Sequence, residues 1–473
     1  MVTEPENPLP RLSFDDLPGT LQRAAGRAGW TSLMPVQAMA IPYVMEGRDL
    51  MVHSRTGSGK TGAFVLPLLE LLDPREATCQ ALVLVPTREL ARQVHATAET
   101  LFDGTDLRTV AVYGGVGYGP QLEALKQGAH LVVGTPGRIL DHLQRRSMVL
   151  KHLRVLIFDE ADRMLSVGFY PDMVALEAYL PKKRRGFMFS ATYPTIVRSL
   201  AQQFLDRPEM LSLSHGHEHV AETDHIAYEV PTLDKSRCLV RIIEIENPSS
   251  AIVFCNTKAN ARLVATVLKR FGYDADHLSS DLSQAAREKV LERVYKGKLR
   301  FLVATDVAAR GIDITGLSHV VLYDFPEDPE SYIHRTGRTG RAGASGEAIS
   351  LVDAVEGLKL KAVARQYKID IEMRPAPTDD DVEAIVAERV TAMLEGELRG
   401  LDKLVAERMQ RMLPLARRLG EDDEERAVIA MLLDQYYQSS QHAKPELPMI
   451  RPAEVEGESA DHPRRRRRRR RRS

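Results

Sequence analysis

The stretch "HSRTGSGKTG", residues 53–62, holds a glycine-rich loop that ends in Lys60 and Thr61. It follows the strand-like run "DLMVH" and precedes the apolar, helix-like run "AFVLPLLELL". A glycine-rich loop between a strand and a helix is the setting of a phosphate-binding site, because backbone N–H groups converge there on phosphate oxygens. Ser54 stands where the usual G-x-x-x-x-G-K-[ST] pattern has its first glycine, so the loop is either a variant of that pattern or a chance match.

The loop combines backbone N–H groups with short polar side chains and one lysine. Lys60 would supply positive charge to the β- and γ-phosphates of a nucleotide, and Thr61 would supply a hydroxyl for Mg²⁺. The residues expected to contact the nucleotide are Ser54, Thr56, Gly57, Ser58, Gly59, Lys60 and Thr61.

A second motif, "VLIFDEAD" at residues 155–162, places acidic residues at the end of an apolar strand. Asp159 would hold Mg²⁺ through its water shell, and Glu160 would position and deprotonate the attacking water. Two carboxylates at this place are costly unless a cation or hydrogen bonds compensate them. The alternative, a solvated strand end, is less favoured because a phosphate loop lies upstream.

Short apolar runs separated by helix-like segments form two series along the chain. The first series covers 81–86, 109–115, 130–136, 155–161 and 186–192, and the second covers 251–257, 300–306, 319–325 and 347–353. Continuous apolar strands alternating with helices are typical of parallel α/β sheets, which bind ligands at the carboxyl ends of their strands. A chain of 473 residues is too long for one ordinary core, so each series predicts one α/β domain.

Two further segments flank the second series. Residues 209–228 are polar, and we interpret them as a linker; a metal site at His215, His217 and His219 is the less favoured alternative. Residues 379–437 follow helical spacing and carry 15 acidic against 8 basic residues, with Gly396 and Gly400 expected to interrupt the helix. A small helical domain with its own core and a surface for self-association are about equally favoured there.

The composition is that of a globular protein, with 44% hydrophobic and 27% charged residues. The acidic, proline-rich start "MVTEPENPLP" differs from a signal peptide, and no apolar run reaches the ~20 residues of a membrane span. The cysteines Cys79, Cys238 and Cys255 have no metal or redox spacing, which favours reduced thiols. We therefore expect a cytoplasmic protein.

Arg464 to Arg472 form a block of nine arginines in a chain that is otherwise acidic. Prolines and charges dominate the whole segment 440–473, which predicts a disordered basic tail. The arginines would bind polyanions such as RNA, less strongly as the salt concentration rises. A passive, solvated end is the alternative.

Six motifs occur in order between residues 14 and 375. They are "SRTGSGKT", "PTRELA" (86–91), "TPGR" (135–138), "DEAD" (159–162), "SAT" (190–192) and "HRTGRTGR" (334–341). With these motifs the chain resembles the DEAD-box ATP-dependent RNA helicases of superfamily 2, in which a small residue often takes the place of Ser54. The segment 379–437 weakly resembles the C-terminal extension of bacterial cold-shock-type members, in which such a segment can dimerise.

The resemblance implies two tandem RecA-like domains with parallel sheets. Residues 1–208 would form the ATP-binding domain with its Q motif, and residues 229–375 the second helicase domain. The small helical extension and the disordered arginine-rich tail would follow.

The resemblance also implies how the base and ribose of ATP are bound. Gln37 would pair with N6 and N7 of adenine, which selects ATP over GTP, and Phe14 would stack on the base. Leu33 and Met34 depart from the family's P-T-P-I-Q pattern and remove a hydroxyl near the loop. Asp306 would contact the ribose or the arginine fingers.

RNA is implied to bind along a track that reads phosphates and 2′-hydroxyls and not base identity. Threonines and arginines would donate to phosphates, and glycines would allow the backbone to approach closely. The residues are Thr87, Arg88, Gly115, Thr135 and Arg138 in the first domain, and Thr305 and Gly311 in the second. Ordinary turns with helix caps are the alternative.

Arginines recur every three residues among the glycines of "HRTGRTGR", a pattern that requires anions. The resemblance makes Arg338 and Arg341 arginine fingers that reach the γ-phosphate from the second domain. The residues implied to couple the ATP and RNA sites are Asp162, Ser190, Thr192, His334 and Arg335.

Together these expectations describe an RNA-stimulated ATPase with ATP and Mg²⁺ as cofactors. Its catalytic residues would be Lys60, Asp159, Glu160, Arg338 and Arg341. ATP and RNA would close the two domains on one bent strand, which unwinds or remodels RNA duplexes and RNA–protein complexes, in ribosome assembly, mRNA turnover or cold adaptation. The alternatives are a DNA translocase and a non-enzymatic RNA chaperone that acts through the arginine tail. A homodimer through 379–437 is also expected, and no membrane partner.

Overall fold

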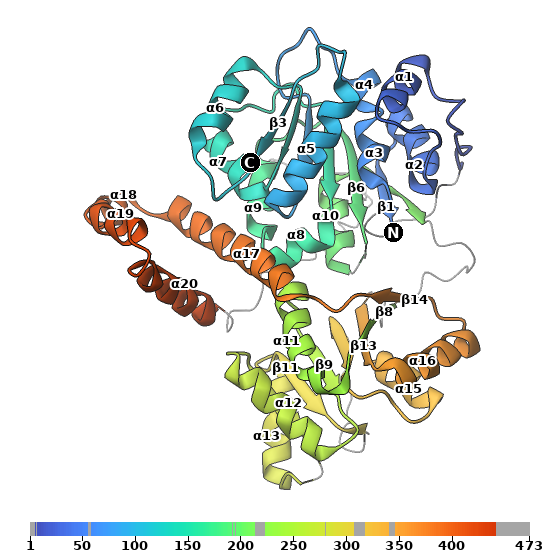
Figure 1. The fold of residues 1–473 in the computed structure, drawn as a ribbon, viewed down its shortest axis with the longest axis vertical. Coiled ribbons are helices and arrows are strands. Elements are labelled where there is room, and N and C mark those ends of the chain that lie inside the picture. Colours follow the sequence, from blue (N-terminus) through green and yellow to red (C-terminus); the bar gives the residue numbers. More distant parts are fainter. Residues whose placement is uncertain are drawn as a thin grey trace, which may run out of the picture.

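The computed structural model describes residues 5, 7–54, 58–191, 193, 195–212, 223–279, 281–306, 317–339 and 346–440. Over these ranges the chain forms two α/β domains and a helical extension (Figure 1). The predictions for the tail beyond Ser440 lie outside the described residues, as do those for five site residues. These five are Thr56, Gly57, Thr192, Gly311 and Arg341.

The first domain is built on a parallel sheet with the strand order β3-β4-β2-β5-β6-β1-β7. Its strands are β1 (Leu50–His53), β2 (Ala81–Leu84), β3 (Thr109–Val112), β4 (Leu131–Gly134), β5 (Val155–Asp159), β6 (Arg185–Ser190) and β7 (Glu209–Ser212). β2, β4 and β5 are buried over their entire length, because helices cover both faces of the sheet.

Ten helices among the described residues of this domain pack in two layers. One layer contains α1 (Gly19–Arg27), α2 (Pro35–Glu46), α3 (Lys60–Val65), α4 (Leu68–Leu71) and α5 (Arg88–Phe102). The other contains α6 (Tyr118–Gln127), α7 (Pro136–Gln144), α8 (Ala161–Val167), α9 (Tyr170–Glu177) and α10 (Thr195–Phe204).

The second domain repeats this plan with the strand order β10-β11-β9-β12-β13-β8-β14. Its strands are β8 (Thr223–Glu229), β9 (Ala251–Phe254), β10 (Ala275–Leu278), β11 (Phe301–Ala304), β12 (His319–Leu322), β13 (Gly346–Val352) and β14 (Ile371–Arg374). One face is covered by α11 (Lys235–Glu246) and α12 (Lys258–Arg270), and a 3₁₀ turn (Thr232–Asp234) leads into α11. The other face is covered by α13 (Gln284–Tyr295), α15 (Pro329–Thr336) and α16 (Ala354–Tyr367).

The two parallel sheets confirm the predicted α/β class, and every strand predicted from an apolar run is present. The structure differs at both ends of the segment interpreted as a linker. β7 pairs with β1 in the first sheet, and β8 pairs with β13 and β14 in the second. These strands have few apolar residues, so pairing with neighbours gives them strand structure where the local pattern does not. The three histidines lie within 213–222, outside the described residues.

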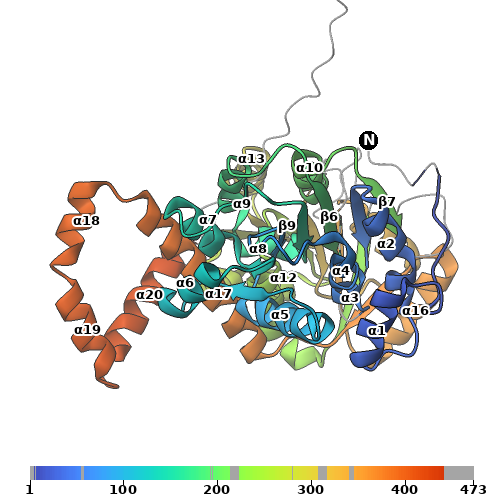
Figure 2. The ribbon, with the colours of Figure 1, turned by 90° about the horizontal axis from the view of Figure 1, so that it is seen from above.

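The extension consists of α17 (Asp379–Gly400), α18 (Lys403–Gln410), α19 (Leu413–Glu421) and α20 (Arg426–Ser440). The Thr378 hydroxyl caps α17, and three aspartates in the first turn interact favourably with the helix dipole. Gly396 lies inside α17 without ending it. α17 runs beside both domains, whereas α18, α19 and α20 project to one side (Figure 2).

In the part of the chain that the structure describes, no helix is both long and apolar enough to cross a membrane.

Candidate functional site

The glycine-rich loop leads from β1 into α3 at the carboxyl edge of the first sheet, the edge formed by the C-terminal ends of its strands. Lys60 is the first residue of α3 and only 6% exposed. Its Nζ donates to the backbone oxygen of Ser54 at 3.1 Å, and the hydroxyl of Ser58 lies 3.3 Å from that of Ser54. Gly59 has φ +89°, a conformation that favours glycine. The described part of the loop thus holds the lysine in a fixed position beside the sheet.

Asp159 and Glu160 follow β5 at the same edge. Asp159 is 2% exposed, and burial raises its pKa to about 7, although the charge of Lys60 lowers it. Its Oδ1 atom is buried without a hydrogen-bond partner. Glu160 has φ +53°, which is uncommon for a residue with a side chain, and it is the N-cap residue that precedes α8. A buried carboxylate oxygen without a donor is a group that a bound cation can compensate.

Ser190, at the end of β6, connects the loop and the acidic motif. Its backbone oxygen accepts from Ser54 N at 3.1 Å, and its hydroxyl oxygen accepts from Asp162 N at 3.2 Å. Ser190 is fully buried, so these two bonds fix its position. Two of the residues predicted to couple the sites, Ser190 and Asp162, are therefore in direct contact.

Gln37, the residue predicted to recognise adenine, lies beside the loop. Its Oε1 accepts from Met34 N at 2.8 Å, and its Nε2 donates to Gly59 O at 3.1 Å. The Met34 thioether covers Gly59, because a Cβ at Gly59 would lie 2.4 Å from the sulfur. Met34 therefore packs against the loop at the position where the family usually has a threonine.

Two aromatic residues lie in the same layer of helices. Phe14, the predicted stacking residue, is partly buried against the core under α1 to α5. Trp30 covers Gly62, where a Cβ would lie 2.3 Å from its ring. The position of Trp30 beside α3 was not predicted, and its only sign in the sequence is that the single tryptophan lies close to Gln37.

The predicted RNA-binding residues of the first domain come together in the loops and first helical turns that follow β2, β3 and β4, which are neighbours in the sheet. The hydroxyl of Thr87 caps α5 by accepting from Leu90 N, and Thr135 precedes α7. Gly115 has φ +72°, and a Cβ there would lie 2.6 Å from the guanidinium of Arg88. Arg138 is 3% exposed and donates to the backbone oxygen of Val116 at 2.9 Å.

Acidic residues of α17 contact both arginines of this surface. Glu388 Oε1 accepts from Arg88 Nε at 2.7 Å and from Arg88 N at 3.1 Å. Glu395 Oε1 accepts from Arg138 Nη2 at 2.9 Å. Burial raises the pKa of Glu388, and the contacts with Arg88 lower it. This contact was missed, and its only sign in the sequence is the acidic composition of 379–437.

Arg335 is the centre of a polar cluster inside the second domain and is 3% exposed. Its Nε and Nη2 donate to the two carboxylate oxygens of Asp306 at 2.9 and 2.6 Å. It also donates to Asp324 O at 2.8 Å and to Asn256 Oδ1 at 2.7 Å. Asp306 and Arg335, predicted to contact ATP and to couple the sites, bind each other here.

The other predicted residues of the second domain that the structure describes are Thr305, His334 and Arg338. They lie close to Asp306 or Arg335 in the sequence. Thr305 is buried directly before Asp306, at the end of β11. His334 is exposed and Arg338 is half-buried, at the C-terminal end of α15.

The second domain turns the amino edge of its sheet toward the first domain. A cleft of about 770 Å³ separates the domains, and its lining includes Glu160, Asp162, His319 and Glu347. His319 and Glu347 lie at the starts of β12 and β13, whereas Asp324 follows the end of β12. The two ends of a four-residue strand, and so the two edges of the sheet, are about 13 Å apart.

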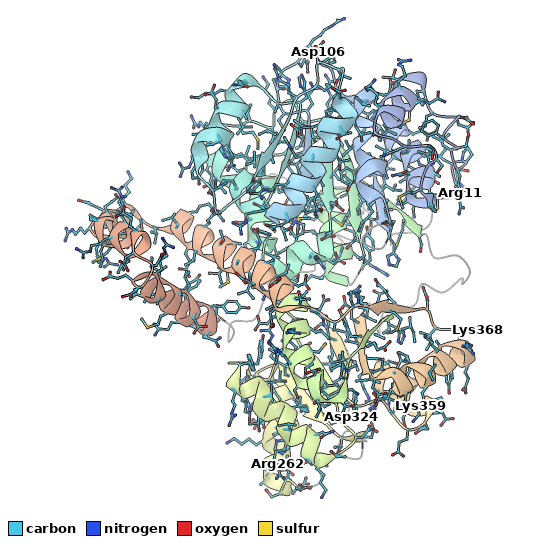
Figure 3. All side chains as sticks on the ribbon, in the orientation of Figure 1. Arg11, Asp106, Arg262, Asp324, Lys359 and Lys368 are labelled. Atoms are coloured by element: carbon cyan, nitrogen blue, oxygen red, sulfur yellow. The ribbon has the colours of Figure 1, made fainter. Side chains whose placement is uncertain are left out.

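Asp324 accordingly lies in the part of the second domain that is turned away from the first (Figure 3). The arginine cluster is at this far edge, so the structure does not bring it to the glycine-rich loop.

Two family models match the chain in the order of its domains. "DEAD/DEAH box helicase" matches residues 34–200, and "Helicase conserved C-terminal domain" matches residues 234–343. Together they span more than half of the sequence.

Characterised relatives extend the match over most of the chain. "RNA helicase CrhR" of Synechocystis is 38% identical over 413 residues, 87% of this chain and 82% of that protein. "DEAD-box ATP-dependent RNA helicase CshA" of Bacillus thuringiensis is 37% identical over 83% of this chain and 75% of that protein. A solved DEAD box protein from Methanococcus jannaschii is 36% identical over 77% of this chain and 99% of that chain, with a TM-score of 0.44. By the family models and the two bacterial relatives, this chain belongs to the DEAD-box ATP-dependent RNA helicases.

Proposed function

We propose that the chain separates short RNA duplexes locally, by closing its two domains around ATP and one RNA strand. The observation that carries this proposal is the division of the site between two sheet edges. The loop and the acidic motif lie at the carboxyl edge of the first sheet, and the cluster around Arg335 lies at the carboxyl edge of the second. Neither edge is a complete site, so a turn of the second domain would complete it.

The first domain would hold ATP and Mg²⁺. Thr61 and Asp159 are the proposed Mg²⁺ ligands, and the buried Asp159 Oδ1 without a hydrogen-bond partner fits that role. The bound cation would shield phosphate charge. Lys60 would orient the β- and γ-phosphates.

The amide of Gln37 would read adenine. Nε2 retains a second hydrogen beside its bond to Gly59 O, and Oε1 retains a second lone pair beside its bond to Met34 N. These free positions match the N7 acceptor and the N6 donor of adenine. Guanine presents an acceptor in place of N6–H, so GTP would lose this pairing.

Hydrolysis would then depend on both domains. Glu160 would accept a proton from the attacking water, and its side chain is buried beside Asp159 at the end of β5. Arg338 and Arg341 would offset the charge that develops on the γ-phosphate after the second domain has turned. Ser190 and Asp162 would transmit closure to the RNA side.

RNA would bind to the loops after β2, β3 and β4, with Thr305 and Gly311 completing the track from the second domain. Arg88 and Arg138 carry guanidinium groups suited to oxyanions, and Gly115 leaves room for the guanidinium of Arg88. Guanidinium–phosphate contacts position the backbone, and contacts of the track to the 2′-hydroxyl would select RNA.

A homodimer through the extension is a further part of the proposal. The residues that support it are large apolar side chains exposed on α18, α19 and α20: Leu404, Leu413, Leu415, Val428, Met431, Leu432 and Leu433. A surface of this kind is typical of an interface. Light scattering at micromolar concentration should give twice the mass of one 52.8 kDa chain, and a monomeric mass would refute the dimer. A reducing compartment such as the cytoplasm fits the three buried free cysteines.

The test of the function is steady-state ATP hydrolysis without nucleic acid, with RNA, and with single-stranded DNA of matched sequence. RNA should stimulate turnover at least tenfold, and DNA should leave it near the basal value. Equal stimulation by DNA would favour a DNA translocase. Turnover that is independent of nucleic acid would refute the RNA track.

A further inference from the structure

One face of α17 forms a continuous contact with the first domain. Residues spaced three and four apart lie on one side of a helix, and here they are Ile385, Glu388, Ala392, Glu395 and Arg399. In the middle of this stripe, Ala392 is 8% exposed and packs with Val167 and Phe169. The contact therefore combines an apolar centre with charged residues on both sides.

The two glutamates of the stripe lie on the surface proposed to bind RNA. Glu388 accepts two hydrogen bonds from Arg88, and Glu395 accepts one from Arg138. The Glu395 carboxylate also lies against Gly114, where a Cβ would meet its Oε2 at 2.8 Å. Carboxylate and phosphate oxygens accept from a guanidinium group in the same way, so these glutamates take the positions of backbone phosphates.

Arg399 closes the contact at the C-terminal end of α17. Its Nη2 donates to Asp172 Oδ1 at 2.6 Å, and its Nη1 lies 3.4 Å from Gly137 O and 3.3 Å from Asp141 Oδ1. Gly137 belongs to the "TPGR" motif at the start of α7, one of the segments proposed to bind RNA. Between Glu388 and Arg399 the helix thus covers the loops after β2, β3 and β4.

Other contacts of α17 hold it to the second domain. Arg389 is 4% exposed, and its Nη2 donates to Glu244 O on α11 at 2.7 Å. Near the start of α17, Asp379 Oδ1 accepts from Arg241 Nε at 2.8 Å. α17 therefore connects the two domains in the arrangement that turns the arginine cluster away from the ATP loop.

We propose that α17 is an internal competitor of RNA, whose Glu388 and Glu395 occupy the phosphate positions at Arg88 and Arg138 and must leave before RNA binds there. The inference rests on the RNA track of the proposed function. Because α17 is bonded to both domains, its release would also free the second domain to turn. RNA would thus remove the block on its own track and permit closure. When RNA is absent, the docked α17 would prevent closure and so suppress ATP hydrolysis.

The test is the double substitution Glu388→Gln with Glu395→Gln in the full chain. Glutamine keeps the size of the side chain but removes the charge, so α17 should dock less tightly on the arginines. The apparent Kd for a single-stranded RNA, measured by fluorescence anisotropy, should fall by about 5- to 150-fold. Its dependence on salt should become steeper, because salt no longer weakens a competing ion pair. ATP turnover at saturating RNA should stay within about twofold, since both residues lie outside the ATP site.

A second variant should weaken the docking of α17 through its apolar contact and not through its glutamates. Ala392→Arg places a long charged side chain in the apolar contact with Val167 and Phe169, and it should lower the apparent Kd for RNA in the same direction. It keeps the proposal testable if the glutamine variant does not fold.

The matched control is Glu383→Gln with Glu407→Gln, which removes the same charge from exposed positions of α17 and α18. It should leave the Kd for RNA unchanged. An equal fall of the Kd in this control would refute the specific contact in favour of general charge repulsion. Unchanged or weaker RNA binding in both test variants would also overturn the proposal.

A further substitution distinguishes a failure of the competitor proposal from a failure of the proposed RNA track. Arg138→Ala, added to the glutamine double variant, should weaken RNA binding again. If Arg138→Ala weakens binding but the glutamine substitutions do not strengthen it, the track is right and the competitor is wrong. If Arg138→Ala has no effect, the track itself is wrong.

Discussion

Glu160→Gln is expected to lower RNA-saturated ATP turnover by about 10²- to 10⁴-fold, the usual contribution of a positioned general base. Glu160 is 8% exposed and is held with φ +53° beside Asp159, so the amide should occupy the same space without accepting a proton. Steady-state phosphate release with saturating RNA is the measurement. Affinity for ATP, measured by calorimetry, should change less than about threefold, because the phosphate loop is intact.

The control for this substitution is Glu177→Gln, at an exposed position of α9, which should retain full turnover. If Glu160→Gln kept a tenth or more of the wild-type rate, another group would have to serve as the base.

Arg338→Ala is expected to lower turnover by about 10³- to 10⁵-fold, as for other arginine fingers. The charge that Arg338 would offset appears only in the transition state, so affinities for ATP and for RNA, each measured alone, should be almost unchanged. Single-turnover hydrolysis with saturating RNA isolates the chemical step. Arg270→Ala, at the exposed end of α12, is the control with an equal loss of charge.

Arg335→Ala should give a different result. Arg335 holds Asp306, Asp324 and Asn256 inside the second domain, so its loss should lower the stability of that domain by about 1.5–3 kcal/mol. Thermal unfolding distinguishes the two arginines, since Arg338→Ala should unfold near the wild-type temperature. A strongly destabilised Arg338→Ala would mean that its loss of activity reports on folding and not on catalysis.

The strands and motifs of both sheets follow from local pattern. Each strand predicted from an apolar run is present, and the described residues of the loop, of "DEAD" and of "SAT" lie at one edge of the first sheet, as parallel strands require. β7, β8, β10 and β14 could not be predicted in the same way. β10 reads "ADHL" and β14 reads "IEMR", patterns that specify little by themselves, and pairing with a neighbouring strand decides their structure.

The contacts of α17 could not be predicted for a different reason. Glu388 and Arg88 are 300 residues apart in the chain, and Glu395 and Arg138 are 257 apart, so only tertiary packing brings these charges together. The orientation of the second domain cannot be predicted from the local sequence pattern either. Which edge of its sheet faces the cleft depends on α17 and on contacts between the domains, such as Asn247 Nδ2 to Ser166 O at 2.9 Å.

The central claim is that RNA and ATP together turn the second domain until its carboxyl edge faces the ATP loop. The direct test is fluorescence energy transfer between two dyes, one attached at Ser32→Cys, close to Gln37, and one at Glu327→Cys, after the end of β12. Both positions are exposed, and the three native cysteines are buried, which favours labelling at the introduced sites. The distance should shorten when RNA and a non-hydrolysable ATP analogue are both present, and it should change little with either one alone. An unchanged distance with both ligands, in labelled protein that still hydrolyses ATP at the full RNA-stimulated rate, would contradict the account.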